Sequence, residues 1–333
     1  MKMMINMFLG VFLISMMLSG AAQEEKIPIV SLMIDVDAPA NPNKDEVRAS
    51  EVDLYALYTE IRKREESATI FLTQDVTASR IRLILAQFSV LSNFEFAISG
   101  NHSDDLMSTM SLEEQEAMLR KSIEVAKMSK ICGLNEIIIK GFMPPSFDQN
   151  EDTYRAMDAV GIEYNAGFQA GLIYAPGHEN DVWPYRVDGY NFFAVPVSTH
   201  EVSGKKMPLY DREMKENGIS ASEWYGILAS KFDQSSARDE PTVILLSTSI
   251  SGEGEYLDAL AKFLDYAASK NATTVNSMDL VRKSKTGSFI ATETEAAECP
   301  TCGQDEGIDL SITLVEAGNS TNSSNSSGQV ADA

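Results

Sequence analysis

The sequence predicts an α/β fold built on a parallel sheet or barrel. From residue 29 onward, segments with strand-like and helix-like hydrophobic patterns alternate along the chain, which is typical of β-α-β connections. The first segment, 29–34, is a short apolar run that ends at Asp35 and Asp37 and is followed by proline and asparagine. Such a run indicates a buried strand. We therefore expect this strand to be the first of the sheet.

Helix N-caps and apolar periodicity define the elements that follow the first strand. Ser50 is a favourable N-cap for one helix, and Ser111 with Glu114 forms a capping box at the start of another, which should run to about residue 130. The elements expected in this part of the chain are helix 50–65, strand 68–72, helix 77–88, strand 94–98, helix 111–130, strand 136–139 and helix 151–160.

The second half of the chain begins with residues 161–200, which are rich in aromatic residues, glycine and proline. This composition predicts short strands and loops. The later elements expected from hydrophobic periodicity are helix 220–232, strand 242–246 ending at Ser247, amphipathic helix 255–269 and a final strand at 273–276.

The N-terminus has the layout of a secretory signal peptide, residues 1–22. Lys2 precedes an apolar run at 5–18, and small residues come before the polar Gln23. An uncleaved membrane anchor is the alternative, and no other segment is apolar enough to cross a bilayer. We therefore expect a secreted or cell-surface protein that meets the membrane only through this segment, if the segment stays uncleaved.

Beyond residue 285 the composition shifts to acidic and then to Ser/Asn-rich sequence. We expect 285–333 to be a disordered, glycosylated tail. Cys299 and Cys302 could pair in a local disulfide or form half of a zinc knuckle. Asn-x-Ser/Thr sites, which accept N-linked glycans in exported proteins, occur at Asn101, Asn271, Asn319, Asn322 and Asn325.

The chain is strongly acidic, with 27 basic against 49 acidic residues and a formal net charge of −22. Because phosphate groups are bound by basic surfaces, this balance argues against nucleic acid or an anionic membrane surface as partner. An acidic, well-solvated surface suits salty surroundings or a cell envelope.

Asp35 and Asp37 are the first candidate site residues. Side chains alternate along a strand, so the two carboxylates face the same way at the carboxyl end, where catalytic residues collect in parallel α/β folds. Two carboxylates so placed suit a metal ligand with a general base, or an acid/base pair. The alternative is that they only cap a turn.

Three further segments follow later strands: Gly-Asn-His-Ser-Asp-Asp at 100–105, Phe-Met-Pro-Pro-Ser-Phe at 142–147 and Leu-Ser at 246–247. In this order, over residues 27–281, the motifs resemble those of the polysaccharide deacetylases, the NodB-like carbohydrate esterases. The resemblance implies a distorted (β/α) barrel over residues 27–284. It also implies removal of acetyl groups from sugar amides or esters with a divalent metal, usually zinc.

The first two motifs of this family place the metal and the base. Family members have Phe-Asp-Val-Asp at the end of the first strand, and the similar Ile-Asp-Val-Asp here makes Asp35 the implied general base and Asp37 the implied metal ligand. The second motif, His-Ser/Thr-x-x-His, leaves only His102 as a ligand. Asp104 and Asp105 are conceivable carboxylate substitutes for the missing histidine.

The last two motifs also depart from the family pattern. Pro144 and Pro145 match the family's Arg-x-Pro-Pro-Tyr, but Met143 stands at the arginine position. Ser247 stands where the family has the histidine that acts as general acid. Since general acid catalysis contributes about 10²–10⁴-fold, its loss favours a degraded or re-purposed site. Two ligands are also fewer than the three that catalytic zinc needs, which would suit a harder, looser ion.

Two further histidines, His178 and His200, lie in or near the aromatic segment. Either could reach the barrel mouth as a substitute ligand or acid, although loop histidines usually have structural or solvent contacts.

Two functions follow from these observations. The first is an exported, metal-dependent deacetylase-like protein acting on cell-surface or extracellular carbohydrate, with impaired activity. The second is a non-catalytic cell-envelope protein that keeps the fold and binds glycan without a cofactor.

Overall fold

The computed structural model describes residues 26–37, 44–74, 93–128 and 138–286, which all belong to one compact unit, Met1–Phe289. The predicted signal peptide, helix 77–88, the cysteines and the glycosylation sites of the tail lie outside these residues. No helix within the described ranges is long and apolar enough to span a bilayer.

Strand β1 (Ile29–Val36) joins three other strands of the sheet. It pairs in parallel with β2 (Ala68–Leu72) and β10 (Thr242–Ser247), and its first residues pair with β11 (Thr273–Val275). Because strands of a parallel sheet are covered on both faces, the run from Val30 to Val36 is buried throughout. The first apolar run of the sequence is therefore the core of the fold.

The other strands extend the sheet away from β2. They are β3 (Phe94–Ile98), β4 (Gly141–Phe142), β5 (Tyr164–Gln169), β7 (Phe193–Val197) and the antiparallel edge strand β6 (Tyr185–Arg186). The sheet then curls back on itself. Ser198, which follows β7, donates its backbone N–H to the carbonyl of Val243 in β10 at 3.0 Å. The predicted distorted (β/α) barrel is confirmed.

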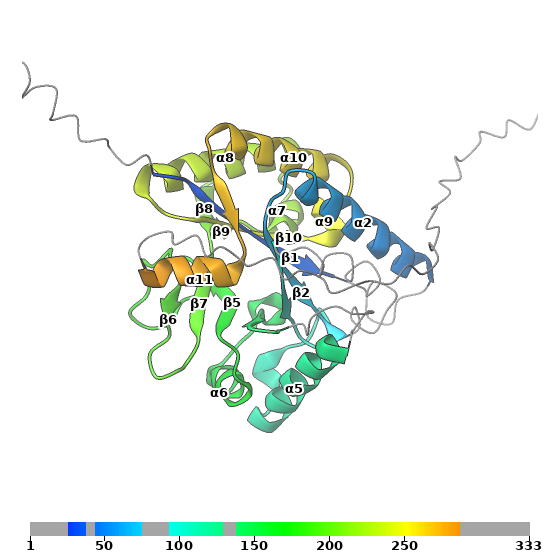
Figure 1. The fold of residues 1–333 in the computed structure, drawn as a ribbon, viewed down its shortest axis with the longest axis vertical. Helices are drawn as coiled ribbons and strands as arrows, with labels where there is room; N and C mark the ends of the chain where they lie inside the picture. The colour runs from blue at the N-terminus through cyan, green and yellow to red at the C-terminus, as the bar shows by residue number, and fades with distance from the viewer. Residues whose placement is uncertain (1–25, 38–43, 75–92, 129–137, 287–333) are drawn as a thin grey trace, which may run out of the picture. The chain divides into compact units, whose positions relative to one another are not determined.

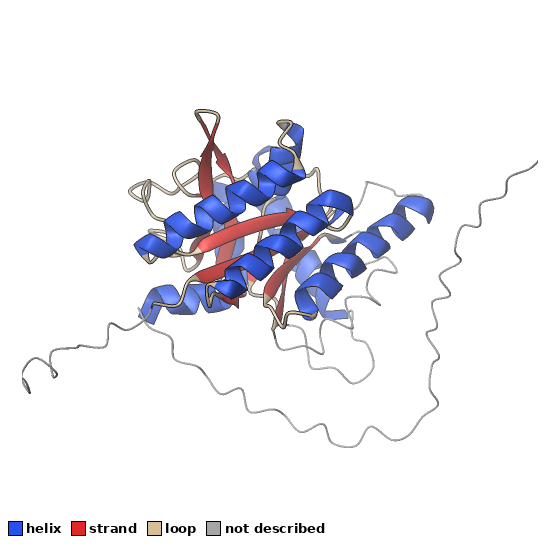
Figure 2. Ribbon diagram, turned by 90° about the horizontal axis from the view of Figure 1, so that it is seen from above, coloured by secondary structure: helices blue, strands red, loops and turns tan. Residues whose placement is uncertain are grey.

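Helices surround the strands (Figures 1 and 2). In Figure 1, α8 and α10 lie above the strands and α5 and α6 lie below them. The long helices are α2 (Lys44–Arg62), α5 (Leu112–Met128), α6 (Glu151–Val160), α8 (Ala221–Arg238), α10 (Gly254–Ser269) and α11 (Ser277–Thr286). The short ones are α7 (Asp211–Glu216), α9 (Thr248–Ser251) and the 3₁₀ turns η1 (Met107–Thr109) and η2 (Pro145–Phe147). A hairpin of β8 (Thr199–Val202) and β9 (Lys205–Pro208) precedes α7.

The predicted capping box at the start of α5 is confirmed. Ser111 N–H donates to Glu114 Oε2 at 2.8 Å, and Glu114 N–H donates to Ser111 Oγ at 3.3 Å. A second capping box joins Ser220 and Glu223 at the start of α8. Each box satisfies two backbone N–H groups that a helix leaves unpaired, which fixes where these helices begin.

Several sequence-based boundaries are wrong. Helix α2 begins at Lys44, six residues before the expected N-cap Ser50. The fourth strand is Gly141–Phe142, and residues 138–139, placed in a strand by their apolar pattern, have no regular structure. The hairpin and the helices α7, α9 and α11 were not expected. Except for α11 they are too short for a hydrophobic period to reveal them.

Candidate functional site

The carboxyl ends of β1 and β10 lie side by side and hold the site. Asp35 in β1 is the register partner of Ser247 in β10, and Asp37 follows one residue beyond the strand. The structure thus brings together Asp35, Asp37 and Ser247, three predicted site residues. They meet because the first and the last long strands are neighbours in the sheet.

The Asp37 carboxylate is surrounded by donors. Its Oδ2 accepts hydrogen bonds from Arg212 Nη2 at 2.5 Å, from Ser247 Oγ at 2.9 Å and from the hydroxyl of Ser249. Its Oδ1 accepts from Thr248 Oγ1 at 2.6 Å and from the backbone N–H of Ser249 at 3.0 Å. Only 12% of the Asp37 side chain is exposed. This carboxylate is a buried, charged acceptor held by protein groups.

Sequence reasoning missed the segment that supplies the arginine. After the hairpin, Leu209 accepts a backbone hydrogen bond from Leu245 N–H at 2.9 Å, which fixes the start of α7 beside β10. Asp211 then accepts from the backbone N–H of Ser247 at 2.9 and 3.0 Å, and from Ser251 Oγ at 2.6 Å. In the sequence this segment shows only an Asp-Arg pair at 211–212, which by itself does not mark a site.

Asp35 and Asp37 differ in charge state. Burial, together with the nearby Asp37 charge, raises the pKa of Asp35 to about 6, and the Tyr210 hydroxyl donates to its Oδ2 at 3.3 Å. Burial also acts to raise the pKa of Asp37, but the Arg212 charge and the hydroxyl donors outweigh it and hold this pKa below its ordinary value. The site therefore combines one fixed anion with one carboxyl that titrates near neutrality.

Asp211 is a third carboxyl in the same cluster. Burial raises its pKa to about 7, although the hydrogen bonds from Ser251 and Ser247 favour the charged form. Three carboxyl groups thus lie around a single guanidinium, that of Arg212.

The turn at Pro144 and Pro145 packs against β5 and, through Phe147, against Tyr210 of the site. Ser146 and Phe147 have φ of 52° and 58°, left-handed values that cost energy for residues other than glycine. This turn places the Phe147 ring edge-on against Tyr210 at 5.9 Å between centroids. Pro144 and Pro145, predicted as possible substrate contacts, instead pack against backbone, as Gly167 and Gly100 show. A Cβ at Gly167 would lie 2.3 Å from Pro144 Cγ, and one at Gly100 would lie 2.8 Å from Pro145 Cγ.

Replacing Gly167 with alanine is therefore expected to lower the free energy of unfolding by about 1–3 kcal/mol, because the new methyl group must displace the Pro144 ring. Chemical denaturation measures this change. Gly226→Ala in α8 is the matched control, since a Cβ there meets open space and alanine favours the helix. A stability loss as large for Gly226→Ala would show that the crowding at Pro144 is not the cause.

The loop that carries His102 is held by hydrogen bonds within residues 101–105. Asp105 Oδ2 accepts from the backbone N–H of Asn101 at 2.6 Å and of His102 at 3.0 Å, and both His102 and Asp104 are exposed. Within the described ranges, no group of three His, Cys, Asp or Glu residues is placed to hold a metal ion. The expected ligand set of Asp37 and His102, completed by Asp104 or Asp105, is therefore not formed. The residues present do not fit a catalytic zinc site.

The other two predicted histidines do not line the site cleft. His178 stacks on Tyr185 with ring centroids 4.0 Å apart and pairs through Nδ1 with Asp181 Oδ2 at 2.6 Å. His200 lies in the β8–β9 hairpin, where burial and the nearby charge of Lys231 lower its pKa. Each of these two histidines has packing or pairing contacts away from the cleft.

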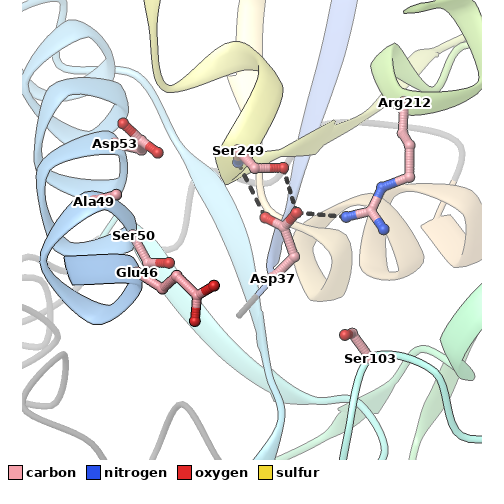
Figure 3. A pocket seen from close by; sticks show the side chains of 8 residues that line it. All are labelled: Asp37, Glu46, Ala49, Ser50, Asp53, Ser103, Arg212 and Ser249. Atoms are coloured by element: carbon pink, nitrogen blue, oxygen red, sulfur yellow. Dashed lines mark hydrogen bonds and ion pairs between the residues drawn. The ribbon is translucent and has the colours of Figure 1, made fainter. Parts of the chain in front are cut away.

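A cleft of about 350 Å³ opens over Asp37 (Figure 3). One side is formed by α2 and the other by Arg212 and the loop after β3. The side chains point into the space between them. The lining residues are Asp37, Glu46, Ala49, Ser50, Asp53, Ser103, Arg212 and Ser249. All of these residues except Ala49 have polar or charged side chains, and the three carboxylates outnumber the one cation.

Asp53 shows that the cleft has a negative potential. Its pKa is raised to about 6 by partial burial and by the charges of Glu253 and Asp37.

Solved structures show what the barrel resembles. No family model and no curated protein sequence matches the chain. A protein assigned as a polysaccharide deacetylase from Mycobacterium smegmatis matches with a TM-score of 0.62 at 14% identity, over 82% of this chain and 97% of that one. Another, from Pseudomonas aeruginosa PAO1, gives 0.61 at 14%, over 79% and 92%. Puue allantoinase gives 0.62 at 15%, over 80% and 94%. At these identities the likeness shows the fold, a distorted (β/α) barrel of the kind seen in polysaccharide deacetylases.

Proposed function

We propose that this chain binds carbohydrate in the cleft over Asp37 and does not hydrolyse acetyl groups by a metal-dependent route. The hydrogen bonding of Asp37 carries the proposal. A carboxylate offers about four lone-pair sites, and here three donors reach Oδ2 and two reach Oδ1. A metal ion would have to displace the guanidinium of Arg212 and several hydroxyl groups, and among the described residues no group of three His, Cys, Asp or Glu side chains is placed to hold it.

The lining of the cleft supports a polyhydroxylated ligand. Serine hydroxyls and carboxylates from α2 and from the loops face one another across the cleft, and such groups make the directional hydrogen bonds that sugars require. The strongly acidic chain also disfavours phosphate-rich ligands. The fold neighbours include proteins assigned as polysaccharide deacetylases, which supports carbohydrate as the ligand class. We also propose that the protein is secreted or displayed at the cell surface and carries glycans on Asn271 and on the tail.

The test combines binding with turnover on one protein sample. Acetylated and fully deacetylated chito-oligosaccharides are titrated calorimetrically, and acetate release is followed with zinc, cobalt or a chelator present. We expect saturable binding and no acetate release under any condition. Asp53→Asn should weaken binding about tenfold or more, since hydrogen bonds to charged groups are worth about 1.5–3 kcal/mol. Asp258→Asn on the exposed face of α10 is the control. Zinc-dependent acetate release would contradict the proposal.

A second candidate function rests on the pKa values of the aspartate pair. Carboxyl groups whose environments push their pKa values apart are typical of acid/base sites, and Asp35, at about 6, suits a general base near neutrality. This hypothesis is a hydrolase that works without metal. It requires acetate release that persists in chelator and is abolished in Asp35→Asn.

A further inference from the structure

Arg212 occupies the centre of the carboxylate cluster. Its Nη2 donates to Asp37 Oδ2 at 2.5 Å and to Ser247 Oγ at 2.9 Å, so one nitrogen joins the ends of β1 and β10. In Figure 3 the guanidinium lies directly beside Asp37, on the side away from α2. Its carbon lies 5.9 Å from the ring centroid of Tyr210, which is the range of a cation–π contact. Several elements therefore converge on this one positive group.

The charge around Arg212 explains why a cation is needed there. The carboxyl groups of Asp35, Asp37 and Asp211 are all buried or nearly so. Burial acts to lower the pKa of Arg212, but Tyr210 and these three carboxyl groups outweigh it and raise this pKa. Buried anions are costly unless an opposite charge or hydrogen bonds compensate them. A guanidinium is suited to this place because it is always charged and is weakly hydrated.

We infer that Arg212 is a built-in cation that takes the place a bound metal ion would have at this strand end. Asp37 Oδ2 and Ser247 Oγ both accept a hydrogen bond from Arg212 Nη2, so they face a positive centre that the protein supplies from α7. The inference shares its site with the proposed function but stands whether or not the cleft binds carbohydrate.

The oxygen atoms around Arg212 determine which metal ions could bind there if Arg212 were removed. Carboxylate and hydroxyl oxygens are hard ligands, which suit Ca²⁺ or Mn²⁺ better than Zn²⁺. The ligating atoms here are the Asp37 carboxylate and the hydroxyls of Ser247, Thr248 and Ser249, and they include no histidine nitrogen and no cysteine sulfur. Shortening Arg212 to alanine leaves the oxygens in place and removes the positive charge. The variant should therefore gain affinity for small cations that the natural chain does not bind at this place.

The experiment compares the natural chain with Arg212→Ala. Thermal unfolding is recorded with methylguanidinium chloride, with CaCl₂ and with MnCl₂, each at millimolar concentration and at matched ionic strength. We expect at least one of the three cations to raise the Tm of Arg212→Ala by several degrees, because a ligand that binds only the folded state stabilises it. The natural chain and the double variant Asp37→Ala/Arg212→Ala should show no such shift. Arg155→Ala, which removes an exposed ion pair on α6, is the surface control.

The outcomes separate clearly. A shift confined to Arg212→Ala supports the inference, and so does recovery of folding by methylguanidinium or Mn²⁺ if this variant is unfolded alone. Equal shifts in the natural chain and the variant, or no shift with any of the three cations, would overturn it. The carbohydrate titration is read independently, since loss of sugar binding leaves the cation response of Arg212→Ala unaffected.

Discussion

Asp37→Ala is expected to lower the free energy of unfolding by about 3 kcal/mol, because it removes a largely buried carboxylate that pairs with Arg212 and accepts several hydrogen bonds. The change takes an ion-pair partner from Arg212 and removes the acceptor shared by Ser247, Thr248 and Ser249. Urea denaturation followed by circular dichroism measures the loss.

A double-mutant cycle tests whether this loss comes from the ion pair. Asp37→Ala/Arg212→Ala should be destabilised by much less than the sum of the two single variants, since it leaves no unpaired charge at the contact. Strict additivity would mean that the 2.5 Å pair of Arg212 and Asp37 contributes nothing specific to stability.

The second large effect is on the pH dependence of stability. Asp211 has its pKa raised from 3.8 to about 7, chiefly by burial, so the folded state holds its proton more tightly than the unfolded state. Its contribution to stability is therefore complete below about pH 4 and is lost as the pH rises through about 7. One unit of pKa shift is worth about 1.4 kcal/mol, so Asp211 alone should remove about 4 kcal/mol of the free energy of unfolding over that range.

Glu95 in β3 changes the free energy of unfolding with pH in the same direction as Asp211. Burial raises its pKa from 4.5 to about 7, so its contribution is present below about pH 4.5 and disappears by neutrality. Unfolding in urea at a series of pH values from 4 to 8 measures both. Asp211→Asn and Glu95→Gln should each flatten the profile, whereas Asp188→Asn at an exposed loop position should not. A profile that rises toward pH 8 would contradict the assigned pKa shifts.

The sequence was informative where a pattern extends over many residues. Strands β2 and β3 and helix α6 begin and end where apolar runs and caps place them. The first apolar run is a buried strand of the barrel, as predicted, and its terminal Asp35 lies next to Ser247 in the neighbouring parallel strand. These features depend on local periodicity and on the general rules of parallel sheets.

The sequence was uninformative where the site depends on contacts between distant short segments. Helix α7 has six residues and no hydrophobic period, so nothing local shows that Arg212 reaches Asp37. The exposure of His102 follows from the way Asp105 ties its own loop, which spacing alone does not reveal. The family resemblance pointed to the strand end that carries Asp35 and Asp37, but it could not say that an arginine stands there.

The position of β1 has a consequence for how the chain folds. This strand is synthesised well before β10 and β11, with which it pairs. The bond from Thr248 to Asp37 joins residues 211 positions apart. Since pairing between distant segments forms slowly, we expect the contacts of Asp37 with Ser247, Thr248 and Ser249 to form late in folding, after β1 has paired with the nearby β2.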